Sequence, residues 1–487
     1  MDLDKINAPL FQALRKHADM EPYQFHVPGH KAGKAYPMEI YEWLRDYAMR
    51  IDLTEQPDID CLLAPSGPIK EAQENTARVF DCDRTFFLTN GSTSGCQAMI
   101  LTNTKPGQKI IMPRDAHMSA FGGMIMSGAE PVFVYPDVDP KWGVTKGVPY
   151  AEYERVLSTH SDIAACFITR PNYYGMCPNI KQVVKLCHEK NIPVLVDEAH
   201  GAHMAFHSAM PDSALESGAD YVVQSAHKTL QAFTGGSWMH LKGPLSDPDK
   251  ASRMVSLLQS TSPSYIIMAT LDLTSYLMGG FGKEIMNRQH KLNKNFRKEA
   301  YKLKGVRIID DSIIDPLRIT VSASDLGLSG IELDLVLRNE YRVCAEMADL
   351  ENVVIIQTVA DDEDTMAALL AALTDISHRF KADPKKRSRL GRQVAATWLA
   401  MQSSPVRMSM REAAFCDSET VPLTQAVGYV ATETVSVYPP GIPAIIPGEE
   451  ITAEKAVLII DLARSGYFIK GLRGSEDFGI RVVKTGI

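Results

Sequence analysis

The stretches PVLVDEAHG (residues 193–201) and YVVQSAHKTL (residues 221–230) decide the fold. Each is a short apolar run that ends in polar residues, as buried strands of a parallel sheet do. Four further runs of this kind alternate with helix-like stretches, at residues 86–88, 109–112, 131–135 and 165–169. This alternation predicts an α/β fold with a mainly parallel central sheet.

A different pattern follows the predicted sheet. A helical stretch at residues 282–303 leads to short apolar runs at 306–309, 317–321 and 353–358, which indicate a smaller α+β unit. We predict an N-terminal arm over residues 1–60, a large domain over 61–300 and a small C-terminal domain over 301–487. The acidic residues at 361–364 are typical of a helix N-terminus. The basic segment 381–392 predicts a solvated loop or helix face.

Composition excludes several classes of protein. The chain has 487 residues, too many for one compact core. Lys and Arg number 51 against 59 Asp and Glu, a net charge of −8, which disfavours nucleic-acid binding. No run of about 18 apolar residues indicates a membrane span, and the N-terminus lacks the apolar region of a signal peptide. The eight cysteines form no C-x-x-C pair, so we expect a cytoplasmic protein without a metal site.

Polar residues follow the predicted strands at the edge of the sheet where ligands bind. After the first strand comes TNGSTSG (residues 89–95), whose Gly91, Ser92, Thr93 and Ser94 open a helix and could either hold a phosphate or cap that helix. After the second comes His117, which is either structural or placed to stack on a planar ligand. A metal site is an alternative, because three histidines closely follow the predicted strand at 193–196, at His200, His203 and His207. Their spacing, however, matches no metal motif.

Asp197 and Lys228 complete the pattern. An Asp at the end of an apolar strand needs a cationic partner, and a desolvated lysine is the nucleophile of Schiff bases. Pyridoxal phosphate fits these parts. Asp197 would keep its ring nitrogen protonated, Lys228 would bind its aldehyde and His117 would stack on its ring. The phosphate would be held by Gly91, Ser92, Thr93 and Ser94 together with Ser225 and His227.

The chain resembles the ornithine/lysine/arginine decarboxylases, which share the aspartate aminotransferase fold. The matching strings run in order through most of the chain: FHVPGHK (25–31), TNGSTSG, PRDAH (113–117), VDEAHGAH (196–203), SAHKTL (225–230), TSPSY (261–265) and YPPGIP with PGE (438–449). The resemblance implies a homodimer or higher homo-oligomer with shared active sites, in which Thr261 and Ser262 reach the neighbour's phosphate. The chain is similar to the short form of the family, where arginine decarboxylases of polyamine synthesis are commonest. Met118, Asn172 and Gly235 depart from the family pattern, which leaves the choice of substrate open.

The expected reaction is decarboxylation of a small basic amino acid, first of all arginine to agmatine and CO₂, through an external aldimine. Lys228, Asp197, His117 and His200 are the expected catalytic residues. Glu449 or Glu450 is a candidate partner for the guanidinium, although both equally suit a helix N-terminus. Lysine or ornithine decarboxylase is the alternative, followed by an aminotransferase, a lyase or a non-catalytic regulatory homologue. A Rossmann dehydrogenase would need a G-x-G-x-x-G turn, which is absent.

Overall fold

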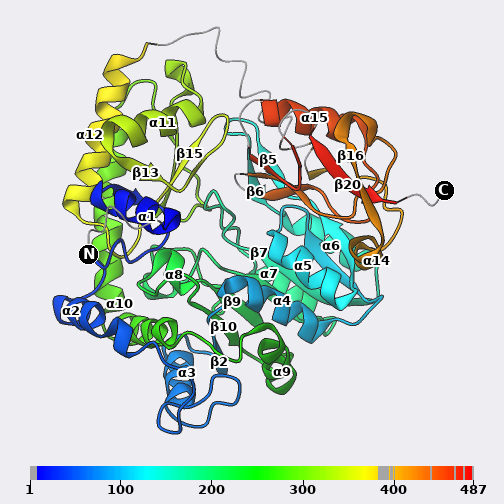
Figure 1. The fold of residues 1–487 in the computed structure, drawn as a ribbon, viewed down its shortest axis with the longest axis horizontal. Helices are drawn as coiled ribbons and strands as arrows, with labels where there is room; N and C mark the ends of the chain where they lie inside the picture. The colour runs from blue at the N-terminus through cyan, green and yellow to red at the C-terminus, as the bar shows by residue number, and fades with distance from the viewer. Residues whose placement is uncertain are drawn as a thin grey trace.

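The structure, a computed structural model, describes residues 8–381, 394, 397, 399, 401–438, 441–464, 468–474 and 478–484 (Figure 1). The basic segment 381–392 lies outside the described residues except for Lys381, and so do Pro439 and Pro440 of the YPPGIP string. Within the described part of the chain, no helix is both long enough and apolar enough to cross a membrane.

A seven-stranded sheet forms the centre of the molecule, in the order β2-β10-β9-β8-β7-β3-β4. Its strands are β2 (Arg84–Leu88), β3 (Lys109–Pro113), β4 (Glu130–Val134), β7 (Ile163–Thr169), β8 (Val194–Asp197), β9 (Tyr221–Gln224) and β10 (Ser237–Leu241). The six strands predicted from the apolar runs are all present. The five strands from β9 to β4 run parallel to one another.

Strand β10 has no counterpart among the predicted strands. It is antiparallel to both β2 and β9, and all five of its residues are buried. Its sequence, SWMHL, carries Ser237 and His240 between apolar residues, so it is not a continuous apolar run. The tertiary contacts on both sides, and not its own pattern, make it a central strand.

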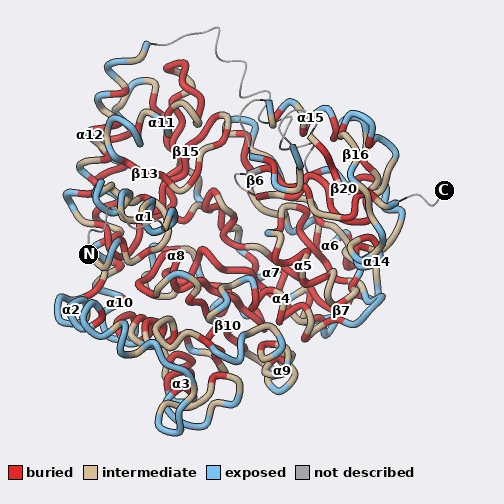
Figure 2. The backbone as a smooth tube through the Cα atoms, in the orientation of Figure 1, coloured by how far each residue is buried: buried red, intermediate tan, exposed pale blue. Residues whose placement is uncertain are grey.

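Helices cover both faces of the sheet because successive side chains of a strand point to opposite sides. Phe86 and Leu88 of β2 share a core with α4 (Gly91–Asn103), α5 (Met118–Ser127) and α9 (Pro248–Leu258). Phe87, between them, packs in the other core. That core is formed by α3 (Pro68–Val79), α6 (Tyr150–Thr159), α7 (Lys181–His188) and α10 (Tyr265–Ala300). Figure 2 shows the buried strands running between these outer layers.

The smaller unit that follows has a sheet of order β11-β12-β15-β14, all antiparallel. Its elements are β11 (Arg307–Ile308), β12 (Arg318–Ser322), α11 (Gly330–Tyr341), β13 (Val343–Ala345), β14 (Met347–Ala348), β15 (Val353–Ile356) and α12 (Glu363–Arg379). The three strands predicted here are confirmed, and Asp362 caps α12 as expected, since its side chain accepts from the Thr365 N–H. The helix predicted at 282–303 is the second half of α10. Helix α10 begins at Tyr265, where the Ser264 side chain caps it.

The N-terminal residues contact both this smaller unit and the first half of α10. They form α1 (Pro9–Asp19), β1 (Tyr23–Phe25) and α2 (Met38–Tyr47), and β1 pairs in parallel with β13. Residues 23–25 therefore pair with a strand more than 300 positions away in the sequence, next to the end of α10.

The C-terminal residues form a further group with its own apolar core. Its elements are α14 (Met410–Phe415), β16 (Ser418–Pro422), β17 (Val435–Tyr438), β18 (Ile442–Ile445), α15 (Ala453–Arg464), β19 (Phe468–Lys470) and β20 (Gly479–Val483). These elements, orange to red in Figure 1, lie beside α5 and α6 of the large sheet. Residues 301–487 thus hold two separate cores, and the division at residues 60 and 300 stays a prediction.

Candidate active site

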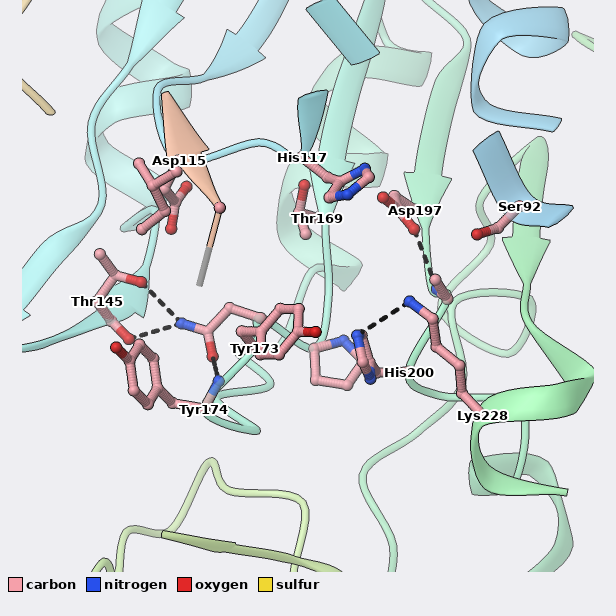
Figure 3. Close-up of a pocket in the computed structure, with 15 residues that line it drawn as sticks. Ser92, Asp115, His117, Thr145, Thr169, Tyr173, Tyr174, Asp197, His200 and Lys228 are labelled. Carbon is pink, nitrogen blue, oxygen red and sulfur yellow. Dashed lines mark hydrogen bonds between the residues drawn. The ribbon is translucent and has the colours of Figure 1, made fainter. Parts of the chain in front are cut away.

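A pocket lies at the carboxyl edge of the central sheet, where the parallel strands end (Figure 3). The segments after β3, β7, β8 and β9 all contribute to it. Helix α4, strand β6 (Val144–Gly147) and residues at the start of β18 also contribute lining residues. The residues that line it are Ser92, Asp115, His117, Thr145, Thr169, Pro171, Asn172, Tyr173, Tyr174, Asp197, Ala199, His200, Lys228, Gly441 and Ile442.

Asp197 and Lys228 enter this pocket from adjacent strands. Asp197 is the last residue of β8, is 6% exposed, and accepts a hydrogen bond from the Ala199 N–H at 3.1 Å. Lys228 follows β9 in the short helix α8 (Ala226–Thr229). Since β8 and β9 are parallel neighbours, their ends lie at the same edge. Burial lowers the pKa of Lys228, against the attraction of Asp197.

His200 connects Lys228 to the smaller unit. Its Nε2 lies 3.1 Å from Nζ of Lys228, and its Nδ1 lies 2.8 Å from Nη2 of Arg318. Burial, assisted by the nearby cations Lys228 and Arg318, lowers the pKa of His200 well below its ordinary value, so the ring is neutral.

The other two histidines of this segment have separate partners. His203 lies 3.2 Å from Asp315 and His207 lies 2.8 Å from the Asn287 side chain. Across the described ranges, no group of three or more His, Cys, Asp or Glu side chains is arranged to hold a metal ion.

The glycine- and hydroxyl-rich turn borders the pocket at the start of α4. Gly91 has φ +74°, a conformation that favours glycine, and its N–H donates to the carbonyl of Gly235 at 2.9 Å. Ser92 lines the pocket. The Ser94 hydroxyl instead donates back to the Gly91 carbonyl at 2.8 Å, and Thr93 is exposed outside the pocket lining.

Ser225 and His227 lie on the turn that also carries Lys228. The Ser225 hydroxyl is buried and has no hydrogen-bond partner in the described structure. His227 Nδ1 contacts the Gly236 carbonyl at 2.9 Å, and burial lowers the pKa of His227 to about 4. A neutral His227 donates to that carbonyl from Nδ1, so its Nε2 is left as an acceptor.

His117 lines the pocket from the N-terminus of α5. Its Nδ1 accepts a hydrogen bond from the Ser119 N–H at 3.2 Å, which fixes the ring at the cap of the helix. Figure 3 shows its side chain between Asp115 on one side and Asp197 on the other. The ring is therefore held in place while its face stays open to the pocket.

Thr261 and Ser262 do not reach this pocket. Both are exposed just before α10 and are absent from the pocket lining. The sequence-predicted site residues that the structure does bring to the pocket lining are Ser92, His117, Asp197, His200 and Lys228.

The two glutamates considered for the guanidinium are both absent from the lining of this pocket. Glu449 is fully buried and pairs with Arg114 and Lys455, each at 3.4 Å. Glu450 pairs with Arg407 at the surface. A carboxylate that already neutralises two buried cations is not available to a substrate.

Asn172, one of the departures from the family pattern, builds a turn beside the pocket. Its amide nitrogen donates to the Thr145 carbonyl at 2.6 Å, and its amide oxygen accepts from the N–H groups of Tyr174 and Met176. Gly235, another departure, has φ +94° and supports the Gly91 turn. Both therefore act on the backbone around the site.

Several pocket residues escaped the sequence analysis. Asp115 lies in the PRDAH string two residues before His117, and it received no role of its own. Gly441 and Ile442 belong to the YPPGIP string, and only the tertiary structure brings them to the large sheet. Arg318 interrupts the apolar run at 317–321, and an arginine in a buried strand is the signal that could have found it.

The FHVPGHK string supports the lysine turn from behind. The Gly29 N–H donates to the His227 carbonyl at 2.8 Å, and a Cβ at Gly29 would lie 2.4 Å from the Leu230 carbonyl oxygen. The buried Lys31 donates from Nζ to the carbonyls of His26 and Ile356. This string therefore fixes the position of residues 227–230 against β15.

Comparison with known proteins gives a consistent result. Residues 8–319 match the family described as "Orn/Lys/Arg decarboxylase, major domain", and residues 389–468 match "Orn/Lys/Arg decarboxylase, C-terminal domain". The chain is 34% identical to an arginine decarboxylase of Halalkalibacterium halodurans, over 98% of this chain and 97% of the relative. It is 25% identical to the inducible lysine decarboxylase of Escherichia coli, over 93% of this chain and 76% of the relative.

The fold is also found in a solved structure. The constitutive lysine decarboxylase of E. coli superimposes with a TM-score of 0.77 at 22% identity, over 99% of this chain and 82% of that one. This likeness establishes the fold, and it confirms the predicted α/β class with a mainly parallel central sheet and a smaller C-terminal part.

Proposed function

The chain belongs to the Orn/Lys/Arg decarboxylase family, and from this membership we propose that it decarboxylates arginine to agmatine and CO₂ with pyridoxal phosphate as its cofactor. One observation carries the choice of arginine: the relative named arginine decarboxylase shares 34% identity over nearly all of both chains, against 25% for the one named lysine decarboxylase.

The pocket has the groups that such a cofactor needs. Asp197 offers a carboxylate for the ring nitrogen, Lys228 an amine for the carbonyl carbon and His117 an aromatic face. The buried hydroxyls of Ser225 and Thr169 lack partners in the described structure, as expected where polar atoms await a ligand. The phosphate would lie at the N-terminus of α4, held by Gly91, Ser92, Thr93 and Ser94 with Ser225 and His227. When bound, pyridoxal phosphate supplies an electron sink for the bond that breaks.

The protein side chains have distinct tasks in this proposal. Lys228 acts as a free amine, because only its unprotonated form is a nucleophile. Asp197 holds a proton on the ring nitrogen. Once Lys228 has taken up the proton that the substrate ammonium releases, Lys228 and His200, whose Nζ and Nε2 lie 3.1 Å apart, would return it to the α-carbon after CO₂ has left. Tyr173 and Ile442 line the same pocket and restrict the access of water.

Asp115 is the acidic group that we assign to the cationic end of the substrate. Asp115 and Asp197 are the two acidic residues in the pocket lining, and Asp197 is assigned to the cofactor. In Figure 3, Asp115 lies at the opposite end of the pocket from Lys228. Burial raises the pKa of Asp115 to about 6, against the Thr145 hydrogen bond and the attraction of Arg114. Asp115→Asn should reduce kcat/KM for arginine at least about tenfold.

The proposed function is tested with an equimolar mixture of arginine, lysine and ornithine. Purified protein with pyridoxal phosphate should release CO₂ and form agmatine first, as measured by mass spectrometry of the products. If cadaverine or putrescine were the main product, the reaction would still be a decarboxylation, but the preferred substrate would be lysine or ornithine. Keto acids without CO₂ would instead indicate an aminotransferase.

We also place Thr261 and Ser262 in the site of a second subunit of a homodimer. Both are exposed and absent from the pocket lining of their own chain. Large apolar side chains are exposed on the N-terminal helices, among them Leu10, Leu14 and Met38, and a second copy of the chain would cover such side chains. All eight cysteines are free thiols, consistent with the cytoplasmic location that we propose.

A further inference from the structure

Arg318 is a buried cation that forms no salt bridge among the described residues, although the carboxylates of Asp315 and Glu346 attract it. It is 1% exposed, and its Nε and Nη1 have no hydrogen-bond partner among the described residues. Its Nη2 lies 2.8 Å from Nδ1 of His200. A Cβ at Gly175 would lie 2.4 Å from Cβ of Arg318, so the backbone at Gly175 leaves room for this side chain. Burying a guanidinium with two unsatisfied nitrogen atoms costs free energy. This cost indicates that Arg318 has a function at the active site.

The positions of the hydrogen atoms between Arg318 and His200 follow from the chemistry of the two side chains. Arginine is always protonated and can only donate. Nδ1 of His200 must therefore accept, which excludes both the Nδ1–H tautomer and the imidazolium. The single ring proton of His200 is then on Nε2, which faces Nζ of Lys228 at 3.1 Å. An ammonium group has no lone pair with which to accept that proton, whereas a neutral amine does.

We propose that Arg318 is a positioning residue that fixes the Nε2–H tautomer of His200, so that His200 donates to Lys228 and holds this lysine as the free amine. The inference rests on the proposed function in that Lys228 is taken as the amine that binds the cofactor. It assigns Arg318 a role through His200 and no contact with substrate or cofactor.

Several charged and titratable groups face the two side chains. Around Lys228 these are Asp197 from β8, Glu346 between β13 and β14, Arg318 from β12 and Cys96 from α4. Around His200 they are Lys228, Arg318, His117 and His227. Arg318 can thus act on Lys228 in two ways, through the tautomer of His200 or directly as a nearby positive charge, and the test must separate the two.

The test measures the amine of Lys228 without substrate or turnover. The full-length chain is stripped of cofactor, its fold is checked by circular dichroism, and it is labelled with acetic anhydride at a series of pH values. Mass spectrometry of peptides then gives the apparent pKa of Lys228, with the exposed Lys105 as an internal reference. We expect the value for Lys228 to lie at least about one pH unit below that of Lys105, and Arg318→Met to reduce this difference while leaving the part that burial causes.

A double-mutant comparison distinguishes the two routes. In a His200→Phe background, Arg318→Met should leave the apparent pKa of Lys228 nearly unchanged, because the hydrogen-bonded route is already gone. Arg318→Lys, which keeps a cationic donor, should retain much of the wild-type difference. An equal effect of Arg318→Met with and without His200 would show a direct charge effect and overturn the proposal.

A measurement on the wild-type chain is available if the variants do not fold. In protein with ¹⁵N-labelled histidine, the His200 resonances are those missing from His200→Phe, and if that variant is unusable they are assigned through their contact with Lys228. The proposal requires an unprotonated Nδ1 between pH 6 and 8, and a protonated Nδ1 would contradict it. Neither readout involves decarboxylation, so failure here is distinguishable from failure of the proposed function.

Discussion

Arg114 and Glu449 form a fully buried ion pair, with 3.4 Å between Nη2 and Oε2. Arg114 follows β3 directly, whereas Glu449 belongs to the C-terminal group of strands. The pair is extended by Lys455, whose Nζ also lies 3.4 Å from Oε2 of Glu449. It joins the loop that carries Asp115 and His117 to the group that contributes Gly441 and Ile442, and so it holds two walls of the pocket together.

This relationship predicts a large difference between two adjacent glutamates. Glu449→Gln leaves Arg114 and Lys455 buried without a counter-charge and should lower the free energy of unfolding by about 3–5 kcal/mol. Glu450→Gln, the matched control, disrupts a surface pair with Arg407 and should cost less than about 1 kcal/mol. Denaturant unfolding measures both. Equal effects of the two substitutions would contradict the structural role of Glu449.

Lys228 should be the residue that binds the cofactor covalently. Borohydride reduction of the purified protein should fix pyridoxal phosphate on Lys228, and Lys228→Ala should lose the visible absorbance of the lysine-bound cofactor. Lys31 is the control, since it is also buried but its Nζ donates to two backbone carbonyls. A tag on Lys31 or on any lysine other than Lys228 would refute the assignment.

Asp197→Asn should reduce kcat far more than cofactor affinity. An amide cannot keep a proton on the ring nitrogen, so the loss falls on the transition state, by about 100-fold or more. Asp220→Asn is the control, because Asp220 is also buried but pairs with His188 before β9 begins. That variant should lose stability and keep kcat. Near wild-type turnover in Asp197→Asn would remove Asp197 from the mechanism.

Asp115 should make stability depend on pH in mildly acidic solution. Its pKa is about 6 in the folded chain and near 4 when unfolded. Between these values the folded state holds a proton that the unfolded state has released, so the free energy of unfolding falls as pH rises from 4 to 6. The expected change is about 2 kcal/mol, and Asp115→Asn should lack it. Identical pH profiles for the two proteins would disprove the raised pKa.

Two inactive variants should complement each other if the site is shared. Lys228→Ala is mixed with a Thr261→Ala, Ser262→Ala double variant, and the subunits are allowed to exchange. Each heterodimer then contains one intact site of two, so up to about half of the wild-type activity per heterodimer should return. The idea fails if verified exchange restores no activity, or if a stable monomer is fully active.

The sequence by itself determined the central sheet and the core of the site. The runs at residues 193–196 and 221–223 are apolar throughout, because a parallel strand covered by helices on both faces has no polar side. Polar residues that follow such runs must lie at the carboxyl edge of the sheet. For this reason Asp197, His200 and Lys228 could be placed together before any coordinates were known.

The tertiary structure alone decided the features that depend on contacts between distant segments. Strand β10 is central because β2 and β9 flank it, although its own residues do not form an apolar run. Glu449 looks like an ordinary acid before a helix until Arg114 is seen beside it. Arg318 sits in the smaller unit and reaches His200 across 118 positions of sequence. Local sequence records which residues can be buried or charged, but the partner of a buried charge is chosen by the packing of segments that the chain brings together only when it folds.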